Sequence, residues 1–473
     1  MEKRKAGVVF IHPDLGIGGA ERLVLDVAVA LSKQHNKVSF MTNHFNKNHA
    51  FQELRENQFP VEVIGDWIPR NICGLCQAFF AYIRMMYLVL IHIFFNNKSK
   101  PDLYFVDQIP IAVPFVKWTG AKVIYYCHHP DLLASVPGGL LKRLYRFPIN
   151  WLESQGTGMA DIILVNSKYT ATVFHETFPS IHRDVQILYP TISSLYQETI
   201  MNGGLTPLGN ILPELQHVQG SFIFLSINRF HPAKNLELAL EGLDLLRNKL
   251  CKDKWDQLHL IIAGGYDPNS VLNAVYFSKL VKLCEKKNLS SKVTFLKSPS
   301  DGIKADLLLN CNCLVYTPIN EHFGIVPLEA MAASKPVIAC NNGGPCETLL
   351  DKVTGYLCDP TPDGMSDGFL KIINNIELDE MGHAGRKRLE QYFSYETFCS
   401  RVNEVVENVI YGNIKLTTLE KIVKVMETVI PEPEYKDVYE DITSSPSSTA
   451  YLSTTISSSE THTSEIETSL ESI

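Results

Sequence analysis

Short apolar, β-branched runs that alternate with helical patterns constrain the fold of this chain more than any other feature. Such alternation is typical of a parallel sheet that is covered by helices on both faces. The pattern occurs twice, on either side of a stretch at 190–220 that lacks periodicity and contains several glycines and prolines. The strands that we expect lie at 7–11, 38–41, 61–64, 103–106, 123–126 and 162–165, and then at 221–228, 260–266, 293–297, 313–316, 335–340 and 353–358.

The fold class is therefore α/β, with two Rossmann-like domains. We predict the first at residues 1–189, a linker at 190–220 and the second at 221–412. A chain of 473 residues with 45% hydrophobic content is long enough for two such cores. A tail follows at 413–473, and from residue 431 it is rich in Ser, Thr and Glu, so we expect it to be largely disordered.

The composition limits the partners and the compartment. A net charge of -8 disfavours nucleic acid as a partner. The 11 cysteines form no CxxC pair and no zinc spacing, so we expect reduced thiols in a cytosolic setting and no bound metal. The first residues lead directly into the strand at 7–11 and do not resemble a signal peptide, so we expect the catalytic body to face the cytosol.

The stretch 317–331 is expected to be a polar loop between a strand and a helix start. Gly324 lets the backbone approach a ligand, and the free N–H groups at the helix start favour an anion. Glu321 and Glu329 flank this position and can accept hydrogen bonds from sugar hydroxyls, so the stretch fits a nucleotide sugar. Taken alone, the two glutamates fit a simpler interpretation, a loop charge and a helix residue stabilised by the helix dipole.

Other strand ends carry groups that suit the same ligand. Gly18 and Gly19 precede a helix after the first strand and can present amides to a phosphate. Arg229 and Lys234 follow the strand at 221–228, where two cations can neutralise a diphosphate leaving group as its charge develops. The simpler alternative is a salt-bridged arginine and an exposed lysine. His128 follows the strand at 123–126, at the sheet edge where α/β proteins bind ligands.

Residues 78–95 are apolar and aromatic except for Arg84 and His92. Their length reaches the roughly 18 residues of a membrane span. A charge near the bilayer centre costs at least about 2.5 kcal/mol, however, and a single span would divide the first domain. We therefore expect a helix of the first domain that contacts the membrane surface, with a buried core helix and a true span as alternatives. The basic cluster at 142–146 suits a diphosphate or lipid headgroups, or is simply a solvated face.

Together these motifs resemble glycosyltransferase family 4, whose members have the GT-B fold of two Rossmann-like domains facing across a cleft. Within that family they are similar to the mannosyltransferases of asparagine-linked glycosylation. The resemblance extends from residue 7 to about residue 412. The stretches that carry it are 12–26, 126–128, 228–229, 234–236, 263–267 and 320–331.

The resemblance implies a retaining enzyme that needs neither metal nor cofactor. The donor would be GDP-mannose and the acceptor a dolichol-diphosphate-linked chitobiose bearing one mannose, to which the second and third mannoses are added in α1,3 and α1,6 linkage. The expected location is the endoplasmic reticulum membrane, with the catalytic domains in the cytosol. Association with other early mannosyltransferases of the same process is also implied.

The resemblance also assigns roles to residues. Arg229 and Lys234 would hold the diphosphate, Glu321 the mannose hydroxyls, Glu329 the ribose, and His128 the sugar from the acceptor side. No covalent nucleophile stands out, so the acceptor proton would pass to a donor phosphate oxygen. The expected catalytic residues are His128, Arg229, Lys234 and Glu321. The expected donor-binding residues are Gly18, Gly19, Arg229, Lys234, Gly324, Ile325, Val326 and Glu329.

Three alternatives remain open at this point. Another family 4 enzyme that uses a UDP-sugar and a lipid acceptor would share the same cations and glutamates. A noncatalytic scaffold with this fold would be expected to lose Arg229, Lys234 or Glu321, yet all three are present. A Rossmann dehydrogenase is disfavoured, because no Gly-x-Gly-x-x-Gly motif follows the first strand.

Overall fold

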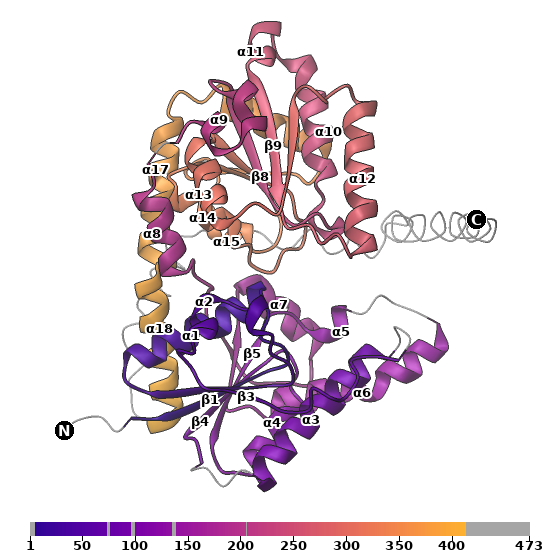
Figure 1. The fold of residues 1–473 in the computed structure, drawn as a ribbon, viewed down its shortest axis with the longest axis vertical. Helices are drawn as coiled ribbons and strands as arrows, with labels where there is room; N and C mark the ends of the chain where they lie inside the picture. The colour runs from indigo at the N-terminus through magenta and orange to yellow at the C-terminus, as the bar shows by residue number, and fades with distance from the viewer. Residues whose placement is uncertain (1–4, 73–75, 96–99, 135–138, 205, 413–473) are drawn as a thin grey trace. The chain divides into compact units, whose positions relative to one another are not determined.

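The computed structural model describes residues 5–72, 76–95, 100–134, 139–204 and 206–412. These residues belong to one compact unit that ends at Gly412. The predicted tail at 413–473 lies outside the described residues. Two parallel sheets, each covered by helices, form the architecture (Figure 1).

The first sheet has seven strands in the order β3-β2-β1-β4-β5-β6-β7. All neighbouring pairs are parallel, and most strand side chains are buried, as expected for a sheet covered on both faces. The chain reverses its direction of strand addition between β1 and β4, which makes their carboxyl ends a topological switch point. The strands are β1 (Gly7–His12), β2 (Lys37–Thr42), β3 (Val61–Val63), β4 (Leu103–Asp107), β5 (Lys122–Cys127), β6 (Ile162–Val165) and β7 (Val185–Ile187).

Helices bury both faces of this sheet. On one face, Leu23 of α1 packs with Phe10 of β1 in a core that also contains Phe398 of α18. On the other face, Met85 of α3 packs with Tyr104 of β4, together with residues of α4, α6 and α7. The helices of this domain are α1 (Gly19–Lys33), α2 (Gln52–Arg55), α3 (Gln77–Phe95), α4 (Ala112–Lys117), α5 (Asp131–Ala134), α6 (Leu140–Gly158) and α7 (Lys168–Thr177), with the 3-10 helix η1 (Lys47–His49).

The second sheet has six parallel strands in the order β10-β9-β8-β11-β12-β13, with its switch point between β8 and β11. The strands are β8 (Phe222–Ile227), β9 (Leu258–Gly264), β10 (Val293–Lys297), β11 (Cys313–Tyr316), β12 (Val337–Cys340) and β13 (Gly355–Cys358). The helices are α8 (Ser194–Asn202), α9 (Leu208–Ile211), α10 (Glu237–Leu246), α11 (Lys252–Asp256), α12 (Val271–Lys286), α13 (Asp301–Asn310), α14 (Val326–Ala332), α15 (Pro345–Thr348), α16 (Pro362–Ile373), α17 (Leu378–Arg388) and α18 (Tyr395–Tyr411). Short turns of helix are η2 (Pro213–Val218), η3 (Pro232–Lys234), η4 (Arg247–Lys249) and η5 (Leu389–Phe393).

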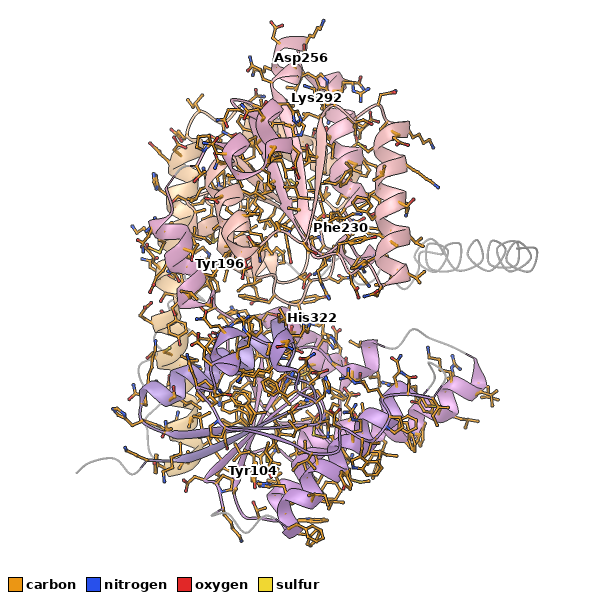
Figure 2. The ribbon with its side chains drawn as sticks, viewed as in Figure 1. Tyr104, Tyr196, Phe230, Asp256, Lys292 and His322 are labelled. Carbon is orange, nitrogen blue, oxygen red and sulfur yellow. The ribbon has the colours of Figure 1, made fainter. Side chains whose placement is uncertain are left out.

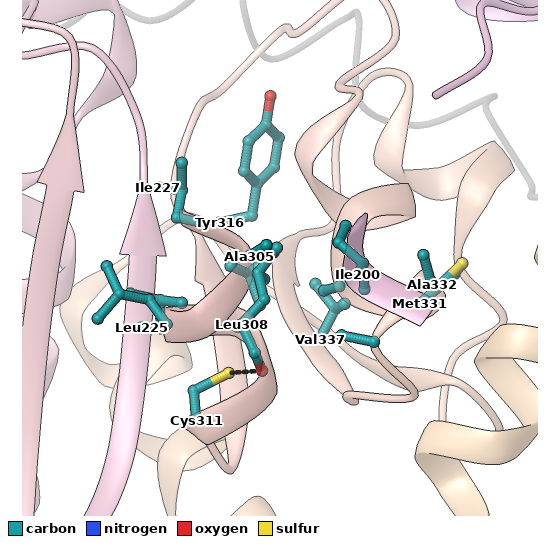
Figure 3. Close-up of a cluster of buried hydrophobic side chains, with 14 of the residues drawn as sticks. Ile200, Leu225, Ile227, Ala305, Leu308, Cys311, Tyr316, Met331, Ala332 and Val337 are labelled. Atoms are coloured by element: carbon teal, nitrogen blue, oxygen red, sulfur yellow. Dashed lines mark hydrogen bonds between the residues drawn. The ribbon is translucent and has the colours of Figure 1, made fainter. Parts of the chain in front are cut away.

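Two segments pack against elements that are distant from them in the chain. The stretch 190–220, which the sequence predicts as a linker, contains α8 and α9. Ile200 of α8 is buried beside Val337 of β12 in the core of the second domain (Figure 3). Helix α18 follows the second domain in the chain, and its apolar side packs into the core of the first domain beside α1. The chain therefore crosses back to the first domain at its described end.

Candidate functional site

The carboxyl ends of β8 and β11 bring together two predicted site residues of the second domain. The Lys234 ammonium forms a close ion pair with the Glu321 carboxylate, and both side chains are largely buried. The Thr317 hydroxyl donates a hydrogen bond of 2.7 Å to the Lys234 carbonyl, which fixes the two segments to each other. Burial, the nearby charge of Glu321 and a hydrogen bond to Glu321 raise the pKa of Tyr316. The Tyr316 hydroxyl therefore stays neutral. A cation and a carboxylate thus occupy one switch point.

Gly324 is required by its backbone conformation. Its φ is +81°, and an added Cβ would lie 3.0 Å from the Tyr316 ring, so only glycine fits without strain. The turn leads into α14, which begins at Val326 with Ile325 as the preceding cap residue. Glu329 lies in the first turn of this helix, where burial raises the pKa of its carboxyl to about 7. The predicted helix start and both glutamates are therefore present in one segment.

Arg229 lies at the same sheet edge, two residues after the end of β8. Its side chain is exposed, and among the described residues it has no carboxylate partner. The adjacent end of β9 approaches so closely that a Cβ on Gly264 would lie 1.9 Å from the Asn228 carbonyl oxygen. The next residue in the chain, Phe230, is buried and donates its N–H to the Gly265 carbonyl (Figure 2). The backbone at Arg229 is thus fixed while its guanidinium stays accessible.

In the first domain, Gly18 and Gly19 stand at the start of α1, as predicted. Gly18 is the cap residue and no side chain caps this helix end. A Cβ on Gly18 would lie 2.2 Å from an oxygen of Glu21, which folds back over the turn. The Glu21 carboxylate therefore occupies part of this helix start, where it accepts a hydrogen bond from its own N–H, and helix geometry leaves the Gly19 and Ala20 N–H groups without an intrahelical partner.

The ends of β1, β4 and β5 form a buried chain of hydrogen bonds around Asp107. The Asp107 carboxylate lies 2.9 Å from His12 Nδ1 and 3.2 Å from His128 Nε2. The other ring nitrogen of His12 lies 3.5 Å from Glu21. His128 also packs against the Tyr126 ring, with 4.7 Å between centroids. His128, the candidate acceptor-side residue, is therefore fixed by a hydrogen bond at its ring edge and by packing against its ring face.

His12 and Asp107 are both ionised in this hydrogen-bonded group. Burial alone would lower the pKa of His12, but its hydrogen bonds to Asp107 and Glu21 outweigh burial and raise that pKa to about 9. Burial alone would raise the pKa of Asp107, but His128 and His12 lower it to about 2. Because an ionised carboxylate only accepts hydrogen bonds, Asp107 holds the proton of His128 on Nε2 and leaves Nδ1 to face other groups.

Further hydrogen bonds join loops of the second domain to the start of α7 in the first domain. His322 lies between the two sheets (Figure 2). Its Nδ1 lies 2.8 Å from the Thr170 hydroxyl, and the Ser167 hydroxyl donates to the His322 carbonyl. Glu347 of α15 accepts hydrogen bonds of 2.8 and 2.7 Å from the N–H groups of Lys168 and Tyr169 at the start of α7. Burial and nearby His129 lower the pKa of His322 to about 4, so the contact between His322 and the Thr170 hydroxyl is made by a neutral imidazole.

Several of these residues were not singled out from the sequence. Asp107 and His12 are the last residues of strands that were predicted, and their place beside the switch point is the signal that could have identified them. No local pattern marks Glu347 or His322, because their partners lie more than 150 residues away in the chain. The predicted residues His128, Lys234 and Glu321 all lie at strand ends, as expected.

Comparison with known proteins agrees with this layout. Residues 17–194 match the family model described as Glycosyltransferase Family 4, and residues 210–388 match Glycosyl transferases group 1. Alpha-1,3/1,6-mannosyltransferase ALG2 from Homo sapiens is 44% identical over 85% of this chain and 96% of the human protein. The Saccharomyces cerevisiae protein of the same name is 36% identical over 88% of this chain and 87% of its own length.

Solved structures share the architecture at lower identity. Sucrose-phosphate synthase from Thermosynechococcus elongatus is 17% identical with a TM-score of 0.67, over 86% of this chain and all of that chain. WaaG, a glycosyltransferase involved in lipopolysaccharide biosynthesis, is 16% identical with a TM-score of 0.63, over 86% of this chain and all of that one. The likeness confirms the predicted GT-B fold.

The buried His12 yields a prediction on stability against pH. Its folded pKa of about 9 exceeds the usual 6.5, so its stabilisation is present below about pH 6.5 and is lost as pH rises through 9. We expect the free energy of unfolding of the wild type, measured by urea denaturation, to fall by on the order of 3 kcal/mol between pH 6.5 and 9. In His12→Gln this fall should be smaller, whereas exposed His182→Gln should behave like the wild type. Equal slopes in all three proteins would contradict the assignment.

Proposed function

Since the chain belongs to the alpha-1,3/1,6-mannosyltransferase family, we propose that it transfers mannose from GDP-mannose to a dolichol-diphosphate-linked oligosaccharide. It adds the second and third mannoses of the N-glycan precursor, in α1,3 and α1,6 linkage. The observation that carries the proposal is the ion pair of Lys234 with Glu321 at the β8/β11 switch point. One contact there combines a cation for the diphosphate with a carboxylate for the sugar.

The donor side of the reaction follows from this contact. The bond between the anomeric carbon of mannose and the diphosphate oxygen breaks, and negative charge develops on the leaving GDP. Lys234 and exposed Arg229 neutralise that charge, without a metal ion, and the N–H groups at the starts of α14 and α1 receive the remaining phosphate oxygens. Glu321 accepts hydrogen bonds from mannose hydroxyls and Glu329 from the ribose.

The acceptor side depends on the first domain. The acceptor hydroxyl attacks the anomeric carbon on the face that the diphosphate leaves, so the configuration is retained. Its proton passes to a phosphate oxygen of the leaving GDP. His128, held by Asp107 through Nε2, presents Nδ1 to a hydroxyl of the sugar and thereby orients it.

We predict that the purified full-length protein in lipid transfers two mannoses from GDP-mannose to synthetic lipid-diphosphate-linked mannosyl-chitobiose, with a chelator present. Lys234→Ala and Glu321→Gln should each lower kcat by at least about 100-fold, because each removes a group that stabilises the transition state. Exposed Lys252→Ala of the same domain is the matched control. Products are identified by linkage-specific mannosidases. Transfer from a UDP-sugar in place of GDP-mannose, or loss of activity with chelator, would contradict the proposal.

The proposed lipid acceptor requires a membrane-facing surface, and α3 supports one. Among the described helices, α3 is long and apolar enough to cross a membrane by length and composition. One side of α3 is part of the first domain, where Met85 and Leu88 are buried and the Arg84 guanidinium donates to the Asn43 carbonyl at 2.9 Å. We infer that the helix lies on the bilayer of the endoplasmic reticulum from the cytosolic side. Its exposed aromatic residues are Phe79, Phe94 and Phe95.

Helix α6 extends this surface. Leu140, Leu144, Phe147 and Trp151 follow one another at helical spacing, and together with Leu141 they are 57–84% exposed. Lys142 and Arg143 stand beside them, which suits a membrane with anionic headgroups.

The same helix is bonded to the segment that follows His128. The Glu153 carboxylate of α6 accepts hydrogen bonds from the N–H groups of Asp131 and Leu132, at 2.6 and 3.0 Å. The membrane-facing helix therefore helps to position the acceptor side of the site.

We predict that the double variant Leu141→Glu with Phe147→Glu floats with lipid vesicles at least about tenfold less than the wild type, since buried apolar area and headgroup attraction drive such binding. The vesicles contain phosphatidylcholine and an anionic phospholipid. Val275→Glu on α12 of the second domain is a control, because Val275 is 61% exposed but lies far from α6 in the chain. Equal flotation of the double variant and the wild type would exclude α6 from the membrane surface.

A further inference from the structure

A continuous series of hydrogen bonds runs between two residues that the proposed reaction uses from opposite domains. His128 stands on the acceptor side in the first domain, and Glu321 stands on the donor side in the second. Asn166 bonds the backbone of His128, and Thr170 bonds Asn166. Thr170 also bonds His322, the residue that follows Glu321. Asn166, Thr170 and His322, here called the bridge, have no role in the mechanism described above.

The first link of the bridge is Asn166, which directly follows β6. Its side-chain Nδ2 donates a hydrogen bond of 3.1 Å to the His128 carbonyl, at the end of the neighbouring strand β5. Because only Nδ2 of an asparagine side chain can donate, this contact fixes the orientation of the amide. The acceptor Oδ1 then receives the hydrogen bond of the Thr170 hydroxyl.

The number of protons determines the direction of the remaining bonds. The Thr170 hydroxyl has one proton and donates it to Asn166, so toward His322 the same oxygen can only accept. Nδ1 of His322, 2.8 Å away, must therefore carry a proton. The Ser167 hydroxyl donates its own single proton to the His322 carbonyl. Each hydrogen bond across this part of the interface thus has one donor and one acceptor.

The bridge is buried and both of its ends are fixed. Thr170 is fully buried, and Asn166 is only 6% exposed. Hydrogen bonds that are shielded from water are stronger and keep their geometry. His322 is one peptide group from Glu321, whose carbonyl accepts a hydrogen bond of 2.7 Å from the Gly344 N–H. A shift of His322 relative to the first domain would therefore also shift Glu321.

A second contact across the same interface provides a comparison. The Glu347 carboxylate accepts hydrogen bonds from the start of α7 and, at 3.1 Å, from the Tyr189 hydroxyl. None of these bonds reaches His128 or His322. If the interface only held the domains together, both contacts would serve that purpose equally. Positioning of the two substrates requires the bridge in particular.

We propose that the bridge sets the position of the acceptor-side His128 relative to the donor-side Glu321 for the transfer step, with Thr170 as its central positioning residue. This inference rests on the proposed mannosyltransferase function. The acceptor oxygen and the anomeric carbon must be aligned for attack, and each substrate is held at one end of the bridge. A broken bridge therefore lowers the rate of transfer without weakening the binding of either substrate.

The test compares Thr170→Val with Thr170→Ser in the full-length protein in lipid, with the synthetic lipid-linked acceptor. Valine keeps the shape of threonine without its hydroxyl, whereas serine keeps the hydroxyl. For Thr170→Val we expect kcat to fall about tenfold, with both KM values and the calorimetric Kd of GDP-mannose within about twofold of the wild type. Thr170→Ser should keep nearly the wild-type kcat. Thr172→Val, at an exposed position of the same helix, is the matched control.

A double-mutant cycle tests whether Thr170 and His322 act through one bond. His322→Phe keeps a ring but removes the Nδ1 proton, and we expect it to lower kcat by about the same factor as Thr170→Val. The double variant should then be no slower than either single variant, because each breaks the same link. A loss of about a hundredfold in the double variant would show independent roles and overturn the bridge.

The other outcomes separate this inference from the proposed function. A wild-type kcat in Thr170→Val would overturn the positioning role and leave the function intact. An equal loss of kcat in Tyr189→Phe would show that the interface merely holds the domains together, and a weaker Kd for GDP-mannose in Thr170→Val would place its effect in the donor site alone. Either result overturns the inference. If the wild type transfers no mannose, the proposed function fails and the inference fails with it.

Discussion

The ion pair between Lys234 and Glu321 is the interaction on which the proposed donor site depends. It joins segments that are 87 residues apart in the chain and that follow β8 and β11, the two strands at the switch point. The Thr317 hydroxyl bonds the Lys234 carbonyl and Tyr316 bonds Glu321, so both contacts hold the same segments in place. Removal of either side chain would leave a largely buried charge without its partner. The pair therefore limits which residue types can occupy both positions.

The first domain applies the same topological rule to a different set of groups. Its switch point lies between β1 and β4, where Asp107 is fully buried between His12 and His128. The parallel arrangement places all strand carboxyl ends at one edge of each sheet, so polar groups gather there without any local sequence pattern. His322 and Glu347 then bond the second domain to the first turn of α7 in the first domain. The catalytic proposal therefore follows from the topology as well as from individual motifs.

The alternating pattern predicted both sheets, because buried parallel strands need β-branched runs and glycine turns. Gly324 was predicted for close ligand approach, and its positive φ gives a second, structural reason for glycine. Asp107 and Glu347 were missed because their roles arise from partners that are distant in sequence. The same reason explains why 190–220 was predicted as a linker, since its short helices gain their apolar contacts from the second domain.

The central claim is that Lys234 binds the diphosphate while Glu321 binds the sugar of one donor. Calorimetric titration of GDP and of GDP-mannose into the wild type, Lys234→Met and Glu321→Gln tests this division directly. We predict that Lys234→Met weakens the binding of both ligands, whereas Glu321→Gln weakens GDP-mannose but not GDP. If Glu321→Gln affected both ligands equally, or if Lys234→Met left GDP binding unchanged, the account of this site would be wrong.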